Sequence, residues 1–430
     1  MKNVLIVSYR YPPQSYVGSL RTGKFAKYLP DFGWRPIVLT VEPENCDFCL
    51  PDEIKIGEVI RTRDFDLRNK LKIAKLNPNK HLFGPSVVQT IQSGAMKCFL
   101  WTLNECLFPD SYVGWYWIVK KKYANGFKSH HIDLMFTSSP PPTVHLVGNF
   151  LRKKLEIPWI ADFRDLWTQK HTWRRIYPLW KAERKLEQWA LRSSDGMITV
   201  SNPLATQLRT LHGKTVWVLT NGFDEDDYNH RPIRKRSGNF RIIYTGNIYR
   251  HKQDPSSLLE AVKDLLGEGF IQQGEVKIEF YGREVSEAKR ISHKMNMGET
   301  VDFPGMVSYK ESIRKQLEAN ILLFLEWTDS RIKGVYTGKI FEYLGARKPI
   351  LAIGPKGGVV EKLLRETGAG RLASDVRETK ELLKEWITVF REKGTVPYGG
   401  DYKLILSKYS RRSKARELAT IFDSVVGKQK

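Results

Sequence analysis

Short runs of β-branched and other apolar residues alternate with helical stretches along most of the 430-residue chain, and this pattern limits the available folds more than any other feature. Alternating strands and helices are typical of parallel sheets that carry helices on both faces. We therefore predict an α/β protein with doubly wound, Rossmann-like sheets. The candidate strands are residues 3–8, 36–41, 59–62, 134–137, 158–162, 196–200, 215–219, 241–244, 276–281, 320–325 and 349–353.

A polar, basic stretch at residues 224–239 interrupts the alternation, which then restarts. A chain of this length holds two or three domains. We predict one doubly wound domain over residues 1–230 and a second over residues 231–405. Ligands bind such sheets outside the carboxyl ends of the strands. Two domains that face each other would therefore enclose a ligand-binding cleft.

Residues 67–130 do not follow the alternation. They carry ten Lys and Arg residues against only Glu105 and Asp110, and they include Trp101, Trp115 and Trp117. We predict a basic helical insert in the first domain. Its helices either lie in the interface of an anionic membrane, or pack their apolar side on the domain and keep their basic side in water.

The chain is strongly basic, with 70 Lys and Arg against 47 Asp and Glu and a net charge of +23. Nucleic acid, anionic lipid and phosphate-bearing substrates are all partners of such a charge. The basic residues are spread over both halves and no recognised nucleic-acid motif is present, which disfavours nucleic acid. The sequence has no apolar run long enough to span a membrane and no signal peptide. We expect a cytoplasmic protein, peripheral at the inner face of the membrane if the insert binds lipid.

The four cysteines, Cys46, Cys49, Cys98 and Cys106, are too few for the disulfide framework of a secreted protein of this length. Cys46 and Cys49 have the spacing of zinc or redox ligands, but they form only half of such a site. We expect unpaired thiols and no metal.

Two motifs in the first half place charged residues after candidate strands. Tyr11-Pro12-Pro13 leads through Gly18 into a helix that carries Arg21, and a helix N-terminus with a nearby Arg is an anion site. Residues 161–167, Ala-Asp-Phe-Arg-Asp-Leu-Trp, run from a strand into a charged turn. Its acidic residues and its Arg either form an ion-pair network that braces the turn or line an active site.

The most specific motif runs from Gly334 to Ile350. A glycine-rich loop leads into a helix that bears Lys339 and Glu342. Exposed amides around residues 338–340 and the Lys339 ammonium suit a diphosphate, and a carboxylate one turn later suits the hydroxyls of a ribose. The simpler interpretation is a surface Lys–Glu helix pair worth about 0.2–0.5 kcal/mol.

Together these stretches resemble the family 4 glycosyltransferases of the GT-B fold over nearly the whole chain. The resemblance also rests on Thr-Asn-Gly-Phe-Asp at residues 220–224 and Tyr-Thr-Gly at 244–246. It implies two facing Rossmann-like domains, with a C-terminal helix in residues 406–430 that crosses back to the first domain. It also implies retaining transfer of a sugar from a nucleoside-diphosphate donor in the second domain to a saccharide or lipid-linked acceptor.

The resemblance carries roles over to individual residues. Glu342 would bind the donor ribose, while Gly18 and residues 338–340 would approach the diphosphate. The predicted donor-binding set is Gly18, Arg21, Gly246, Asn247, Arg250, Lys252, Gly282, Val307, Gly338, Lys339, Ile340 and Glu342. The predicted catalytic set is Asp162, Arg164, Asp165 and Lys339.

The chain departs from the family pattern at three points. The first of two glutamates common in the family is absent, because Gly334 stands at its position. Arg164 aligns with a histidine of many members, and the Arg and Lys after the first strand of the second domain are shifted to Arg250 and Lys252. We expect these cations and helix-end amides, rather than a metal or another cofactor, to stabilise the leaving nucleotide.

The family's polysaccharide enzymes suggest UDP as the nucleotide, with UDP-glucose as one candidate donor. We also expect a monomer. Two other interpretations remain open: a GT-B relative that is not a transferase, such as a nucleotide-sugar epimerase, and a basic nucleic-acid-binding protein.

Overall fold

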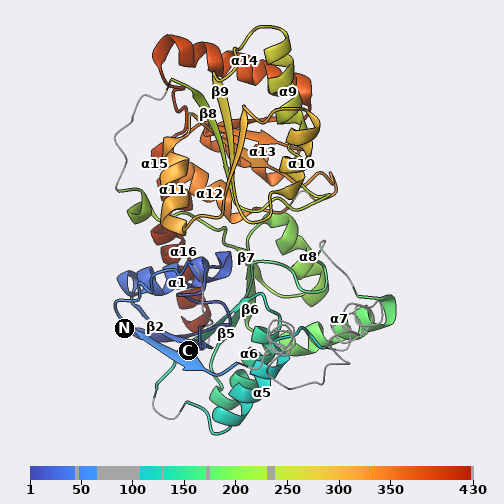
Figure 1. Cartoon of the computed structure of the whole chain (residues 1–430). Helices are drawn as coiled ribbons and strands as arrows, with labels where there is room; N and C mark the ends of the chain where they lie inside the picture. Colours follow the sequence, from blue (N-terminus) through green and yellow to red (C-terminus); the bar gives the residue numbers. More distant parts are fainter. Residues whose placement is uncertain are drawn as a thin grey trace, which may run out of the picture. The chain divides into compact units, whose positions relative to one another are not determined.

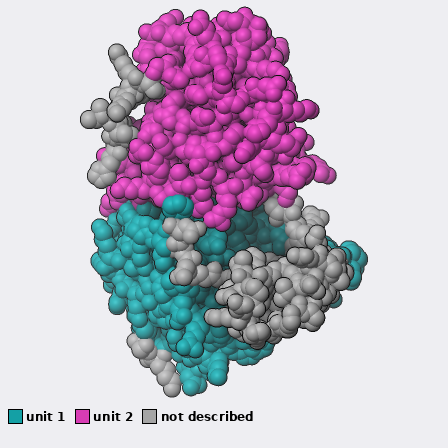
Figure 2. Space-filling model, viewed as in Figure 1, with its two compact units in different colours: residues 1–219, 415–430 teal, residues 220–414 magenta. Residues whose placement is uncertain are grey.

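The computed structural model describes residues 1–43, 48–64, 107–127, 130–170, 175–229, 238–332 and 334–427. It contains two compact units, coloured separately in Figure 2. Unit 1 comprises residues 1–219 and 415–430, and unit 2 comprises residues 220–414. The boundaries thus fall after Leu219 and Lys414, whereas the sequence placed them at residues 230 and 405.

Unit 1 contains a sheet of seven parallel strands in the order β3-β2-β1-β4-β5-β6-β7. Successive side chains of a strand point to opposite faces of the sheet. Leu5 and Val7 of β1 therefore join one core cluster, and Val4 and Ile6 join the other. The strands are β1 (Lys2–Ser8), β2 (Trp34–Val41), β3 (Glu58–Thr62), β4 (Leu134–Ser139), β5 (Trp159–Phe163), β6 (Gly196–Thr199) and β7 (Val216–Val218).

Helices bury both faces of this sheet (Figure 1). Helices α5, α6, α7 and α8 contribute to one core cluster, and α1, η1 and α16 from Ala415 onward contribute to the other. The chain enters unit 1 again at Ala415, and Phe422 packs edge-on against Trp34 with ring centroids 5.2 Å apart. The bounds are α1 (Val17–Tyr28), η1 (Leu29–Phe32), α5 (Val113–Lys122), α6 (Thr143–Leu155), α7 (Tyr177–Leu191), α8 (Asn202–His212) and α16 (Arg411–Val426).

Unit 2 contains a second parallel sheet, of six strands in the order β10-β9-β8-β11-β12-β13. Helices α9, α10 and α14 cover one face, and α11, α12, α13 and α15 cover the other. The strands are β8 (Phe240–Thr245), β9 (Val276–Tyr281), β10 (Val301–Gly305), β11 (Ile321–Leu325), β12 (Ile350–Ile353) and β13 (Gly370–Ala373). The helices are η2 (Glu225–Tyr228), α9 (Ser256–Gly267), α10 (Ser286–Lys294), α11 (Tyr309–Glu318), α12 (Gly338–Ala346), α13 (Val359–Thr367), α14 (Val376–Lys393) and α15 (Tyr402–Tyr409).

The predicted fold class is confirmed, since both sheets are parallel and covered by helices on both faces. The prediction missed β10 and β13, which are the two edge strands of the second sheet. Edge strands are less buried than central ones, so their apolar pattern is weaker. In β10 only Val301 is buried, and the polar Asp302 and the imino acid Pro304 interrupt the run.

Most of the predicted insert at residues 67–130 lies outside the described residues, namely 67–106, 128 and 129. Its described helix, α5, buries Trp115 and Val119 in the core and exposes Lys120, Lys121 and Lys122. One side of α5 therefore packs on the domain, and its basic end stays exposed. A search of the described helices finds none that is long and apolar enough to cross a membrane.

Cys49 is disulfide-bonded, so the expectation of unpaired thiols is wrong for this residue. The other cysteines, Cys46, Cys98 and Cys106, lie outside the described residues.

Candidate functional site

The strand order of each sheet reverses once, and this switch point is where doubly wound sheets bind ligands. In unit 2 the reversal lies between β8 and β11, and in unit 1 between β1 and β4. Most of the predicted donor residues follow β8, β9, β10 or β11 in unit 2. The candidate site is therefore the carboxyl edge of the second sheet, next to its switch point.

Lys339 and the turn after β8 meet at this edge. The Lys339 ammonium lies over the ring of Tyr244, 3.7 Å from the ring centroid, and donates a hydrogen bond to the Tyr244 hydroxyl. A Cβ added to Gly246 would lie 3.1 Å from Lys339 Nζ. The structure thus places the Lys339 ammonium, at the start of α12, in contact with the glycine turn after β8.

Glycine is required at both turns that form this edge. Gly246 has a φ of +112°, a conformation that other residues rarely adopt, and its N–H donates to Tyr281 O at 2.7 Å. A Cβ on Gly282 would collide with the Gly246 carbonyl oxygen. The Tyr244 hydroxyl, which accepts from Lys339, donates in turn to Asn247 O at 2.8 Å. Tyr244 therefore ties the Gly246–Asn247 turn to the start of α12.

The electrostatics of Lys339 suit an anionic ligand. Burial lowers the pKa of Lys339 to about 7, and the neighbouring Glu342 carboxylate offsets part of that effect. Thr337, the N-cap of α12, makes no capping hydrogen bond, and its Oγ1 is buried without a partner among the described residues. A bound anion would restore the charge of Lys339 and would meet the positive end of the helix dipole.

Glu342 lies one turn further along α12 and does not form an ion pair with Lys339 within the part of the chain that the structure describes. Its Oε2 accepts a hydrogen bond from Gln316 Nε2 at 3.2 Å. Burial raises the pKa of Glu342, while Gln316, Arg411 and Lys339 lower it. The surface Lys–Glu pair considered from the sequence is therefore not what the structure contains.

The remaining predicted donor-binding residues differ in their burial and in their contacts at this edge of the sheet. Ile340 is fully buried in the core, so only its backbone is available to a ligand, and Val307 packs half-buried against the same cluster. The Arg250 side chain is 68% exposed and its Nε lies 3.7 Å from Glu287 Oε2. Lys252 Nζ lies 5.5 Å from the ring centroid of Trp327. The structure shows no contact between Arg250 and Lys339 among the described residues.

In unit 1, Arg21 and Asp162 form a fully buried ion pair. Arg21 Nη2 lies 2.8 Å from Asp162 Oδ1 and its Nε 3.0 Å from Oδ2, and both side chains have 0% exposure. Ser138 Oγ also donates to Asp162 Oδ2, at 2.7 Å. This geometry corresponds to an ion-pair network that braces the sheet. Both side chains are fully buried in this network, so the catalytic role expected for Asp162 and the donor-binding role expected for Arg21 stay predictions.

Arg164 and Asp165 are more accessible. Their side chains pair at 3.1 Å with exposures of 18% and 58%. A Cβ on Gly18 would lie 3.0 Å from Arg164 Nη1 and 3.5 Å from Arg10 Cβ. Gly18 and Arg164 therefore lie together at the start of α1, whereas the anion site predicted there pairs Gly18 with Arg21. Arg10 was missed, although it directly precedes the Tyr-Pro-Pro motif.

Two further residues of the unit 2 site were missed. Tyr244 belongs to the Tyr-Thr-Gly motif, but nothing in the motif indicates that its hydroxyl contacts a lysine 95 residues later. Gln316 is fully buried, and its Nε2 also lies 3.2 Å from Thr245 Oγ1. Its helical position gave no signal of a polar role.

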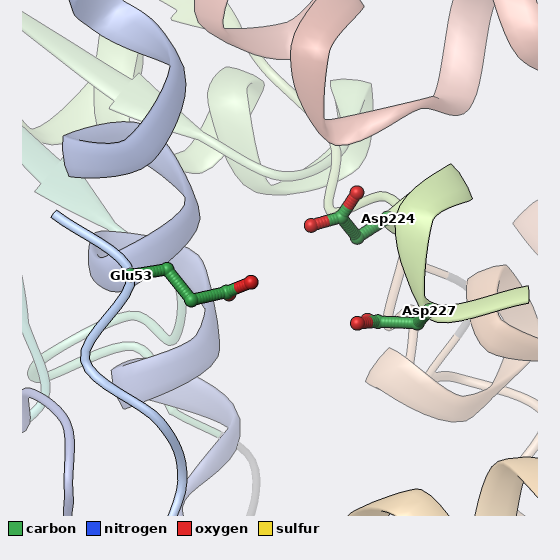
Figure 3. A group of neighbouring side chains, drawn as sticks. All are labelled: Glu53, Asp224 and Asp227. Atoms are coloured by element: carbon green, nitrogen blue, oxygen red, sulfur yellow. The ribbon is translucent and has the colours of Figure 1, made fainter. Parts of the chain in front are cut away.

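Figure 3 draws three carboxylates, of which Asp224 directly precedes η2 and Asp227 belongs to it, both in unit 2. Asp224 caps η2 by accepting from Asp226 N at 3.1 Å, and Asp227 Oδ2 accepts from the Tyr309 hydroxyl at 2.9 Å. Glu53, the third, belongs to unit 1. Because the units are not placed relative to one another, these three residues do not define a metal site.

Part of the chain matches a known protein family. Residues 104–227 match the family model described as Glycosyltransferase Family 4. No curated protein sequence matches the chain. The match and the two-sheet fold confirm the resemblance to family 4 glycosyltransferases of the GT-B fold. They also support the prediction that the protein is a glycosyltransferase.

Solved structures share the fold at low sequence identity. HepE from Anabaena, in complex with UDP and glucose, has a TM-score of 0.63 at 14% identity, covering 99% of this chain and 100% of that one. Sucrose-phosphate synthase from Thermosynechococcus elongatus has a TM-score of 0.64 at 13% identity, with 100% of both chains covered. WaaG, a glycosyltransferase involved in lipopolysaccharide biosynthesis, has a TM-score of 0.56 at 12% identity, covering 99% and 98%.

Proposed function

We propose that this chain is a retaining glycosyltransferase that moves a sugar from a UDP-sugar, such as UDP-glucose, to a saccharide or lipid-linked acceptor. The contact of Lys339 with Tyr244 and the Gly246 turn, at the switch point of unit 2, is the observation that carries this proposal. The choice of UDP draws support from HepE, which was solved with UDP and with UDP-glucose.

In this proposal the donor diphosphate lies between the Gly246 turn and the start of α12. As the bond to the sugar breaks, the nucleotide gains negative charge, which a fixed cation and helix-end amides stabilise more strongly than they stabilise the intact donor. Lys339 supplies that cation and takes up a proton when the diphosphate binds, because burial holds its pKa near 7 in the empty site. No metal or further cofactor has a role in it.

Glu342 binds the ribose in this proposal, and the ribose does not change during the reaction. Glu342→Gln is therefore expected to raise the Kd for UDP and the donor KM about tenfold while kcat changes less. Gln is neutral and has nearly the same shape, so stability is preserved. Calorimetry with UDP and the steady-state release of UDP from UDP-glucose measure both effects.

Glu381→Gln is the matched control, because Glu381 is exposed on α14 in the same unit. Wild-type UDP affinity in Glu342→Gln would contradict the ribose assignment. Sugar analysis of the products separates a transferase, which releases UDP, from an epimerase, which returns an altered UDP-sugar.

We also propose that unit 1 contacts an anionic membrane, through exposed aromatic residues that have basic neighbours. Lys120 Nζ lies 4.9 Å from the Trp117 ring and Lys181 Nζ 4.6 Å from the Tyr177 ring. Trp117 and Tyr177 are 59% and 65% exposed. Aromatic rings and cations together favour a lipid interface.

Each basic residue near an anionic surface contributes about 1 kcal/mol. Changing Lys120, Lys121 and Lys122 to Glu is therefore expected to abolish low-salt sedimentation with anionic vesicles. The control changes three exposed lysines of unit 2 to Glu, namely Lys289, Lys294 and Lys310. If the wild-type protein stays in the supernatant with anionic vesicles at low salt, the membrane proposal is wrong.

A further inference from the structure

Glu326 directly follows β11 and lies across the switch point from Gly246. β11 pairs with β8 on one side and β12 on the other. The loops after β8 and β11 are tied together, because Thr328 N–H donates to Lys252 O at 2.9 Å and Gln253 Nε2 to Leu325 O at 2.7 Å. Both Glu326 and Lys339 follow β11 in the chain, but Lys339 contacts Tyr244 at the end of β8, whereas Glu326 stays at the end of β11. The two side chains therefore flank the ligand-binding edge.

The Glu326 carboxyl group has no hydrogen-bond or ion-pair partner within the described ranges, although the residue is half-buried. Burial, together with the nearby Glu361 carboxylate, raises the pKa of Glu326 to about 7. Polar groups removed from water normally find a partner, because leaving them unpaired costs free energy. An unpaired carboxyl group at this edge is therefore available to a ligand.

Glycines surround this carboxyl group where it meets α13. A Cβ on Gly354 would lie 2.5 Å from Glu326 Cβ, and one on Gly358 would lie 3.4 and 3.5 Å from the two carboxyl oxygens. The neighbouring titratable groups are Glu361, whose carboxylate accepts from Gly357 N at 2.6 Å, and Tyr336. Burial raises the pKa of Tyr336, which stays a neutral phenol and donates to Val359 O at 3.2 Å. The Glu361 carboxylate repels a phosphate, whereas hydroxyl groups can donate to a carboxylate.

We propose that Glu326 accepts hydrogen bonds from the hydroxyl groups of the donor sugar, while Lys339 holds the diphosphate. This inference rests on the proposed function, since it divides one bound UDP-sugar between Lys339, which contacts the end of β8, and Glu326 at the end of β11. The sugar is neutral and rich in donors, which suits an unpaired carboxylate. The diphosphate is anionic, which suits the buried lysine.

The test compares the Kd values of UDP and UDP-glucose by calorimetry in wild type and in Glu326→Gln. The ratio of the two Kd values reports the contribution of the sugar to binding, because the nucleotide contacts of Lys339 and Glu342 are common to both ligands. We expect Glu326→Gln to bind UDP within twofold of wild type and UDP-glucose about tenfold more weakly. Glu381→Gln is the control and leaves both values unchanged.

A second variant keeps the carboxyl group and blocks the access to it. Gly358→Ala places a methyl group beside both carboxyl oxygens at a backbone conformation that alanine adopts readily, with φ −86°. It is expected to weaken UDP-glucose binding and to spare UDP. Gly267→Ala is its control, because a Cβ there meets nothing within 4 Å.

A pH series adds a readout that a purely structural role would not change. The wild-type preference for UDP-glucose over UDP is expected to weaken below pH 7, where Glu326 takes up its proton. Glu326→Gln should retain only the smaller change that comes from the terminal phosphate of UDP, whose pKa is about 6. The Tm of Glu326→Gln at pH 8 should equal or exceed that of wild type, because the variant removes a half-buried, unpaired charge.

Two results overturn the inference while the proposed function stands: an unchanged UDP-glucose to UDP ratio in Glu326→Gln, or an equal loss for both ligands. A wild-type protein that binds UDP-glucose no more tightly than UDP also overturns it. A wild-type protein that binds neither ligand instead refutes the UDP-sugar proposal itself, and the inference with it.

Discussion

Lys339→Ala is expected to lower kcat for UDP release from UDP-glucose about tenfold to a hundredfold, and to raise the donor KM by no more than that factor. A charge-assisted contact contributes about 1.5–3 kcal/mol, and the contact strengthens as the leaving nucleotide gains charge. Steady-state kinetics and calorimetry with UDP measure both quantities. Lys289→Ala is the control, because Lys289 is an exposed lysine of the same unit.

The same lysine predicts a pH dependence with a definite sign. Burial holds the pKa of Lys339 near 7 in the empty site, and a bound diphosphate raises it, so UDP binding takes up a proton. UDP affinity should therefore fall between pH 7 and 8.5, approaching tenfold per pH unit, a range above the pKa of about 6 of a terminal phosphate. Lys339→Ala should show a flat profile. Wild-type kinetics in this variant would refute the site assignment.

Asp162→Ala is expected to destabilise unit 1 by about 3–5 kcal/mol, because it leaves the Arg21 guanidinium fully buried without its carboxylate. Replacing both partners with apolar residues, Arg21→Met with Asp162→Leu, should restore much of that stability. Denaturant unfolding followed by separate probes of the two units measures the change, since a protein of two units need not unfold in one step.

The more exposed ion pair of Arg164 and Asp165 is expected to contribute less to stability than the buried pair. Arg164→Ala or Asp165→Ala should cost less than about 1 kcal/mol, because one of these side chains is mostly in water. If Asp162→Ala unfolds like wild type but loses donor turnover, the residue is catalytic and the structural role argued from its burial is wrong.

The motif from Gly334 to Ile350 shows how far local pattern reaches. The order of glycine, lysine and glutamate predicted a helix start that faces a diphosphate and a ribose, and α12 begins at Gly338 with Lys339 in its first turn. The same pattern also allowed a surface Lys–Glu pair. Only the tertiary structure distinguishes the ligand site from the surface pair, because Lys339 contacts Tyr244 of β8 and not Glu342.

The Ala-Asp-Phe-Arg-Asp-Leu-Trp motif shows where local pattern fails. Three charged residues within four positions looked equivalent in sequence, yet Asp162 is fully buried while Asp165 is 58% exposed. The partner of Asp162 is Arg21, 141 residues away, and not its neighbour Arg164. Strand alternation turns Asp162 toward α1, and no feature of the motif itself contains that information.

The sequence by itself determined two parallel sheets, since alternating apolar strands and helices bury their apolar surface in few other ways. It also determined where glycines and charges follow the strands. The tertiary structure alone decided which of those charges are buried, paired or unpaired: Arg21 with Asp162, Lys339 with Tyr244, and Glu326 with no described partner. The physical reason is that burial and pairing depend on elements that are distant in sequence and pack together over a strand end. The periodicity of apolar residues, in contrast, depends only on residues that are close in sequence.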